Sequence, residues 1–80
     1  MDKINENTQM HIDVAKQYYT YYKLEVERCT DMLNSEHMTE THKSYFEICK
    51  NLFLELMEME GKKIINLYKL QQEITKALKK

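Results

Sequence analysis

Glycine and proline are almost missing from this sequence, and their scarcity limits what the chain can fold into. Its 80 residues contain one glycine, Gly61, and no proline. A multi-stranded sheet needs several turns, and turns draw on Gly, Pro, Asn and Asp for their special backbone angles. The commonest residues favour helix, while 42% of the chain is hydrophobic and 31% is charged. The sequence therefore predicts a single all-α domain over residues 1–80, rather than a sheet, a disordered chain or a membrane span.

Residues 4–36 carry the spacing of one long amphipathic helix. Two interleaved series of apolar residues each repeat every seven positions: Ile12, Tyr19, Val26 and Leu33 in one, and Ala15, Tyr22 and Cys29 in the other. Asn5 and Thr8 continue the same phase with polar side chains. Such a stripe is the seam that one helix presents to another. We therefore expect this stripe to face a second helix.

A polar segment at residues 34–39 is the one break that the first sixty residues indicate, because its Asn and Ser compete with helical hydrogen bonds. Thr39, Thr41 and Ser44 are each suited to cap the helix that follows. We place this second helix at about 41–79. Its apolar pattern again has helical spacing: Phe46, Cys49, Phe53, Leu56, Met57, Ile64, Leu67, Gln71, Ile74 and Leu78.

Gly61 is the residue at which this second helix would break. A glycine inside a helix costs only about 1 kcal/mol relative to alanine. A helix ending there would have Glu58 and Glu60 at its carboxyl end, and a new helix would open with two lysines. Both placements oppose the helix dipole. The sequence therefore favours an antiparallel hairpin of two long, coiled-coil-like helices, and the alternative is a three-helix bundle broken at Gly61.

The hairpin also predicts which residues face each other. If the turn is centred near residue 39, each residue of the first helix faces the one equally far beyond the turn. The expected pairs are Leu33 with Tyr45, Cys29 with Cys49, Val26 with Leu52 and Phe53, Tyr22 with Leu56, Tyr19 with Met59, Ala15 with Ile64, and Ile12 with Leu67. Apolar residues meet apolar residues almost throughout, which supports the hairpin.

One seam does not hide enough apolar surface to offset the conformational entropy of ordering the chain. Several apolar residues fall outside it: Ile4, Tyr18, Tyr21, Met32, Ile48, Leu54, Ile65, Tyr68 and Leu70. These side chains need a second surface to pack on. We expect the hairpin to pair with a second copy as a four-helix bundle, or with a helical partner from another protein.

A run of tyrosines at residues 18–22 is the most unusual string in the chain. Tyrosine combines a large apolar area with a hydroxyl group and is enriched at protein interfaces. Methionine, which occurs six times, adapts readily to different binding surfaces. We predict a protein interface formed by Tyr18, Tyr19, Tyr21, Tyr22, Met32, Leu54, Met57, Ile65 and Tyr68.

The two parts of the chain differ in charge. Residues 1–60 hold six basic and twelve acidic side chains, whereas residues 61–80 hold six lysines and one glutamate. Lysines at a helix carboxyl end complement the helix dipole. A basic helix at 62–80 also suits contact with an acidic protein, a nucleic acid or an anionic membrane. The lysines concerned are Lys62, Lys63, Lys69, Lys76, Lys79 and Lys80.

Cys29 and Cys49 form the candidate thiol pair. A redox-sensitive disulfide or half of a metal site is one reading, but packed helices only sometimes bring two Cα atoms within bridging range. We favour two buried free thiols that pack as small hydrophobic side chains. The three histidines lack the close Cys or His pairs typical of zinc sites. No metal, cofactor or small-molecule substrate is expected.

The sequence shows no phosphate-binding loop, no metalloprotease motif and no nucleophile elbow, so we do not expect an enzyme. It predicts a small protein–protein interaction module that self-associates and binds a protein target, as an adaptor, an assembly subunit or a small inhibitor. Lysine outnumbers arginine eleven to one, a bias that is common in AT-rich genomes, including those of many viruses, phages and low-GC bacteria. The alternative function is binding of nucleic acid or an anionic membrane through residues 62–80. The start of the chain has no apolar signal region, and we expect a soluble protein of the cytoplasm or the host-cell cytoplasm.

Overall fold

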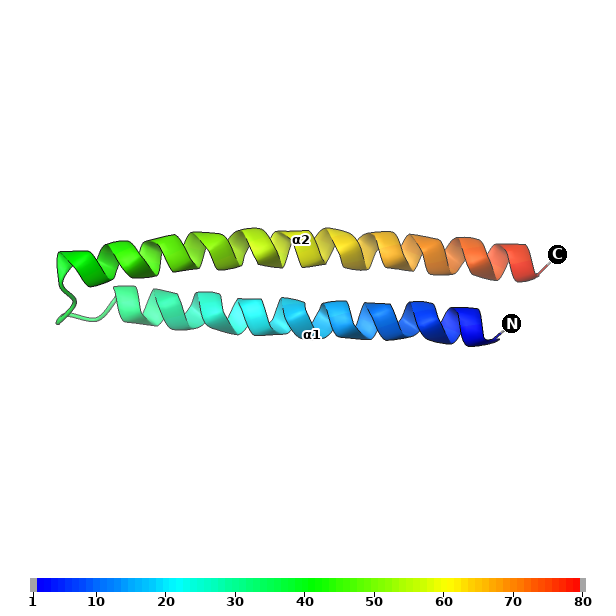
Figure 1. Ribbon diagram of the computed structural model, residues 1–80, viewed down its shortest axis with the longest axis horizontal. Helices are drawn as coiled ribbons and strands as arrows, with labels where there is room; N and C mark the ends of the chain where they lie inside the picture. Colours follow the sequence, from blue (N-terminus) through cyan, green and yellow to red (C-terminus); the bar gives the residue numbers. More distant parts are fainter. Residues whose placement is uncertain (1, 80) are drawn as a thin grey trace.

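The computed structural model describes residues 2–79, except for the side chains of Asp2 and Ile4. Two helices, α1 (Asp2–Leu33) and α2 (Glu40–Leu78), run antiparallel and are joined by residues 34–39 (Figure 1). This confirms the all-α hairpin. Helix α1 ends three residues earlier than the predicted residue 36, and α2 begins one residue earlier than predicted.

Helix α2 runs without interruption through Gly61, so the three-helix alternative is wrong. Gly61 has an ordinary helical conformation, because no glycine in the described residues has a positive φ. A Cβ atom added at Gly61 would lie 3.6 Å from Cε2 of Tyr19, which is ordinary van der Waals contact. The glycine therefore marks a place where the two helices pack closely, and not a hinge or a turn.

The turn is closed by hydrogen bonds at both of its ends. At the carboxyl end of α1, the backbone N–H of Asn34 donates to the carbonyl of Thr30, and that of Ser35 donates to the carbonyl of Met32. Thr39 is the N-cap of α2: its Oγ1 accepts a hydrogen bond from the backbone N–H of His42 at 3.3 Å. Capping of this kind satisfies one of the free N–H groups of a helix start. Of the three predicted caps, Thr39 is the one used.

The core of the hairpin follows the predicted seam of α1. Ile12, Ala15 and Cys29 are 0%, 1% and 1% exposed, and Thr8 is 5% exposed. The other seam positions of α1 are half-buried: Asn5, Tyr19, Tyr22, Val26 and Leu33. Every position of the heptad stripe therefore faces α2, including the polar positions at its start. Helix α2 has no residue buried to the degree of Thr8, Ile12, Ala15 and Cys29.

Several of the predicted facing pairs are wrong. Tyr45, Leu52 and Met59 are 60%, 54% and 65% exposed, and Leu56 lies at 36%. Tyr19 packs against Gly61 instead of Met59, and Tyr22 lies 6.1 Å from Phe53 between ring centroids. Distance from the turn sets how far along α2 a residue lies, but the 3.6-residue period decides which way it points. The side of α2 that faces α1 is the one bearing Phe53, Met57, Ile64, Leu67, Gln71 and Ile74.

The hairpin is a rod of 62 × 14 × 13 Å, with its termini at one end and its turn at the other (Figure 1). Its radius of gyration is 18.1 Å, whereas a compact domain of this length has a radius of about 12 Å. Its accessible surface is 6442 Å², against about 5,100 Å² for a compact protein of the same mass. The chain thus exposes far more surface than a self-sufficient domain of its size.

Candidate protein-interaction surfaces

One side of α1 carries an exposed line of large side chains next to the seam. Val14, Tyr18, Tyr21 and Met32 are 45%, 50%, 55% and 39% exposed. They are spaced so that successive members lie above one another on a helix. The ring of Tyr18 stacks on that of the seam residue Tyr22, with centroids 6.2 Å apart, and Tyr21 meets Tyr22 edge-on at 5.7 Å. The aromatic packing of the seam therefore continues outward onto this surface.

A matching line runs along α2. Its large apolar members are Tyr45, Leu52, Leu56, Met59 and Leu70, and all of them are exposed. They again follow spacings of three, four and seven, or a sum of these, so they share one side of the helix. Cys49 belongs to the same line and is half-buried.

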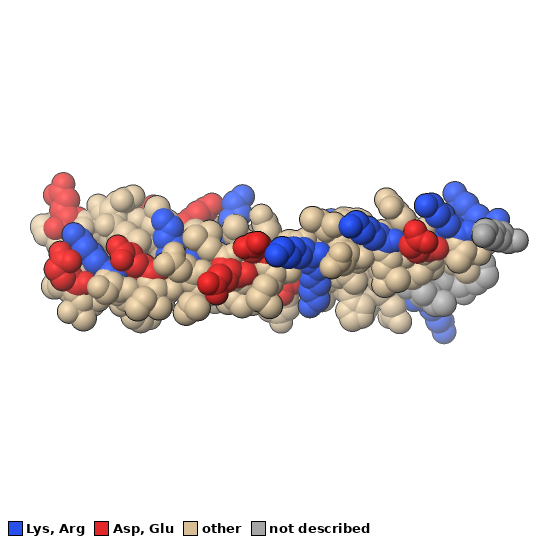
Figure 2. Space-filling view, turned by 90° about the horizontal axis from the view of Figure 1, so that it is seen from above, with Lys and Arg blue, Asp and Glu red and all other residues tan. Residues whose placement is uncertain are grey.

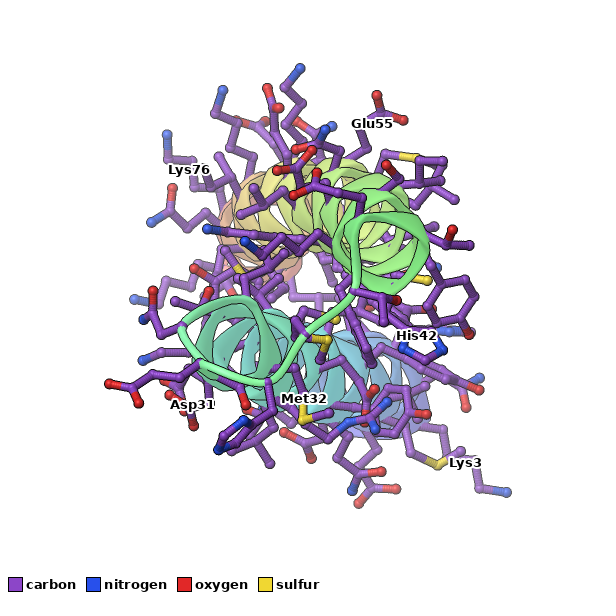
Figure 3. The ribbon with its side chains drawn as sticks, turned by 90° about the vertical axis from the view of Figure 1, so that its left-hand side faces the viewer. Lys3, Asp31, Met32, His42, Glu55 and Lys76 are labelled. Carbon is purple, nitrogen blue, oxygen red and sulfur yellow. The ribbon has the colours of Figure 1, made fainter. Side chains whose placement is uncertain are left out.

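Contacts across the hairpin show that these two lines lie on the same side of the seam. Arg28 lies on the same side of α1 as Tyr21 and Met32, seven residues after the first and four before the second. Its charge acts on the phenol of Tyr45, from the α2 line. Besides burial, Cys49 of α2 contributes to the raised pKa of the Cys29 thiol. Figure 3, which looks along the hairpin from the turn, shows Met32 of α1 and His42 of α2 on a common side. We call the surface formed by the two lines the apolar face.

The opposite side of the hairpin is different, and we call it the polar face. Helix α1 contributes only polar side chains to it: Glu6, Gln9, Asp13, Lys16, Thr20, Lys23, Glu27 and Thr30. Its cross-helix contacts are polar too. The Nε2 group of Gln71 donates to Oε1 of Gln9 at 2.9 Å, and Nζ of Lys16 lies 5.1 Å from the ring centre of Tyr68. That contact with Tyr68 raises the pKa of Lys16.

A shallow groove interrupts the polar face beside Gly61. It is lined by Tyr19, Leu54, Met57, Glu58, Gly61, Lys62 and Ile65. The groove exists because the glycine has no side chain where Tyr19 crosses α2. Leu54 and Ile65, on either side of it, are 38% and 56% exposed.

The predicted interface residues fall into three places. Tyr18, Tyr21 and Met32 lie on the apolar face, where they are exposed. Tyr19, Tyr22 and Met57 lie in the seam and are half-buried. Leu54, Ile65 and Tyr68 are exposed on the α2 side of the polar face. The structure therefore does not bring all nine residues into one surface.

The interface prediction omitted the α2 half of the apolar face. The facing pairs predicted from the position of the turn place Tyr45, Leu52 and Met59 in the seam, as partners of α1 residues. Successive residues lie about 100° apart around a helix. Leu52 and Met59 are one residue before Phe53 and two residues after Met57, so they could not share the side of α2 on which Phe53 and Met57 lie. Among the residues predicted to lie outside the seam, every one that the structure describes is exposed: Tyr18, Tyr21, Met32, Ile48, Leu54, Ile65, Tyr68 and Leu70.

Both cysteines are free thiols in the structure. Burial, followed by the influence of Cys49, raises the pKa of the Cys29 thiol. A raised pKa leaves less of the reactive thiolate at neutral pH. Hydrogen bonding to Cys49 raises the pKa of the Tyr45 phenol. The two thiols are therefore neighbours, with Cys29 in the seam and Cys49 on the apolar face, and they form no disulfide bond.

The predicted basic residues do not form one patch. Lys62, Lys69 and Lys76 are spaced by seven and lie along the outer side of α2, away from α1. Figure 2 shows basic side chains over the half of this surface nearest the termini and mostly acidic ones over the half nearest the turn. Lys63 lies toward the apolar face, Lys79 follows the helix end, and Lys80 lies outside the described residues. The ammonium of Lys62 is 3.4 Å from Glu58.

Three ion pairs join described residues, and each lies within a single helix. The tightest, Arg28 with Glu25 at 2.7 Å, is on the apolar face and neutralises two of its few charges. Within residues 2–79, no three His, Cys, Asp or Glu side chains are grouped so that they could hold a metal ion. Neither helix has a stretch long and apolar enough to cross a membrane over that same range.

Comparison with protein-family models, with curated proteins and with solved structures found no match for this chain.

Proposed function

We propose that this chain is a small protein-interaction module that associates with itself through the apolar face and then binds a protein target. The observation that carries the proposal is the breadth of this face, which extends over both helices, from Met32 and Tyr45 beside the turn to Val14 and Leu70. Exposed apolar surfaces of this extent mark sites of protein association in soluble proteins. Tyrosine and methionine, which supply much of its area, are the residues enriched at such interfaces.

The surface area supports association with a second copy. Two separate hairpins expose twice the 6442 Å² of one, whereas a compact protein of the combined mass exposes about 8,500 Å². The difference, about 4,400 Å², falls within the range of about 2,000–5,000 Å² that obligate homodimers bury. A four-helix bundle of two hairpins is the simplest arrangement that hides both apolar faces.

The target of such a dimer would meet the surface that remains outside. There the groove beside Gly61, with Leu54 and Ile65 on either side and Tyr68 nearby, is the main apolar feature of the polar face. These three side chains are the part of the predicted interface that dimerisation leaves free. An adaptor, an assembly subunit or a small inhibitor would all act by such non-covalent binding.

Self-association is tested by sedimentation of the purified chain over a concentration range that reaches below micromolar. We expect a mass of twice 9.7 kDa. Leu52→Glu places a charge on the apolar face and should give monomers, because a dimer would bury two such charges without partners. Asn51→Glu is the matched control: it adds the same charge at the neighbouring exposed position, on the polar face, and should remain dimeric. A monomeric parent, or two variants that behave alike, would contradict the proposal.

A second candidate function is binding of nucleic acid or an anionic membrane. The observation that favours it is the row formed by Lys62, Lys69 and Lys76. Phosphate contacts release counterions, so such binding weakens steeply as salt is added. Titration of labelled DNA, RNA and anionic vesicles at low salt would reveal it, and no binding under those conditions would exclude it.

A further inference from the structure

The hairpin carries opposite net charges on its two halves. Tyr19 and Gly61, which pack against each other near the middle of the rod, divide it. The half with the turn, residues 20–60, has four basic and nine acidic side chains, a net charge of −5. The described residues of the half with the termini, 2–19 and 61–79, have seven basic and four acidic side chains, a net charge of +3. Figure 2 shows this asymmetry along α2.

Two hairpins can cover each other's apolar faces in two ways that respect twofold symmetry. In a parallel dimer the two turns lie together at one end, and in an antiparallel dimer each turn lies beside the other chain's termini. Six of the nine large apolar side chains of the face lie in the half with the turn, and Val14, Tyr18 and Leu70 lie in the half with the termini. Either arrangement still places apolar side chains of one face on those of the other.

The net charges of the two halves favour the antiparallel dimer. A parallel dimer places the −5 half of one chain against the −5 half of the other. An antiparallel dimer places each −5 half against a +3 half. Most of these charged side chains lie on the polar face or the outer side of each hairpin, so those of neighbouring hairpins are separated by up to the width of the bundle, about 25 Å. This distance is within the Debye length of about 30 Å at 0.01 M salt. Charges on neighbouring hairpins therefore still interact, and like charges side by side oppose association.

We propose that the occupant of the apolar face is a second copy of this chain bound antiparallel, so that the turn of each hairpin lies beside the termini of the other. This inference rests on the self-association proposed above and adds the orientation. Each end of the assembly then holds the turn of one hairpin and the termini of the other. The two Gly61 grooves then lie on opposite outer surfaces near its middle.

The orientation is tested by measuring distances between spin labels in the dimer. Both native cysteines are replaced by alanine, and a single cysteine is introduced as Ser35→Cys in the turn. In the antiparallel dimer the two labels are separated by nearly the 62 Å length of the rod. In a parallel dimer they lie within the width of the bundle, about 25 Å, and that result would overturn the inference.

Thr20→Cys, in the same background, is the matched control near the middle of the rod. Its two labels lie within the bundle width in either orientation, so a short distance there reports dimer formation itself. A short distance at Thr20 with a short distance at Ser35 refutes the antiparallel arrangement and leaves self-association standing. Monomers in both labelled variants and in the parent would instead refute self-association.

A second measurement uses the unmodified chain and does not depend on the cysteine replacements. Raising sodium chloride from about 0.01 M to about 0.1 M shortens the Debye length from about 30 Å to about 10 Å. If opposite charges face each other, the dimer dissociation constant should rise at least threefold. A dissociation constant that falls would indicate like charges side by side, and one that stays constant would indicate no net attraction between the charged halves. Either result would contradict the antiparallel dimer.

Discussion

Truncation of Ile12 tests most directly whether the seam holds the hairpin together. Its side chain is 0% exposed, at the centre of the packed stretch that includes Ala15. Ile12→Ala removes three buried carbon atoms, each worth about 0.8 kcal/mol. Incomplete collapse of the cavity adds to this loss, and such substitutions cost about 2–5 kcal/mol in all. We expect the free energy of unfolding to fall by about 3 kcal/mol.

Ile65→Ala is the matched control, because the same atoms are removed from a side chain that is 56% exposed. Because these atoms are largely exposed, their removal costs less than half of their transfer free energy, about 1 kcal/mol. The better helix propensity of alanine offsets a few tenths of a kcal/mol of this loss. The measurement is urea unfolding followed by far-ultraviolet circular dichroism, at one fixed protein concentration since association shifts apparent stability. Equal losses in the two variants would refute the assignment of Ile12 to the core.

Three further measurements test other features of the rod. Gly61→Ala should stabilise the protein by about 1 kcal/mol through helix propensity, since the new Cβ makes an ordinary 3.6 Å contact with Tyr19; a loss of stability in the same urea assay would show that the close packing there tolerates no side chain. In the monomeric Leu52→Glu variant, where no second copy covers Cys49, Cys29 should react with iodoacetamide much more slowly than Cys49, because Cys29 is 1% exposed and burial raises its pKa. Equal rates by mass spectrometry would contradict its burial. Since the unfolded chain loses the Cys29 proton at a lower pH than the folded chain, stability should also fall as pH rises above about 8.5.

The sequence predicted α1 and its seam well because the heptad stripe there is unambiguous. From Asn5 to Leu33 each position of the stripe faces α2, even where the residue is polar. The uninterrupted α2 was also predictable, since the charges around Gly61 opposed a helix end there. The Thr39 cap was one of three equivalent choices, and only the structure selects it.

The orientation of α2 was harder to predict because its seam contains residues that pattern analysis treats as outward-facing. Glu60 is half-buried in line with Phe53 and Met57, and its Oε2 is buried without a hydrogen-bond partner in residues 2–79. Leu56 and Met59, which are more apolar, point away from the seam. Hydrophobicity alone favours the wrong side of α2 at this point.

The sequence predicted which residues belong to the candidate interaction surfaces better than it predicted how they are grouped in space. Of the fifteen large apolar side chains that are exposed among the described residues, the sequence identified eight. It did not separate those on the apolar face, such as Tyr18, from those on the polar face, such as Tyr68. That separation depends on which residues of α1 and α2 flank the seam together, which cross-helix contacts such as Lys16 with Tyr68 establish.

The position of the turn at one end of the rod also determines the order in which the fold can assemble. Contacts near residues 34–39 join residues close in sequence, whereas the hydrogen bond between Gln9 and Gln71 spans 62 positions. Closing a loop of about 60 residues directly costs about 1.6 kcal/mol more than closing one of about 10. Pairing of α1 with α2 should therefore start at the turn and proceed toward the termini, because each pair that forms shortens the loop that the next pair has to close. The end that holds both termini forms last and opens first, so amide protons there should exchange with solvent before those beside the turn.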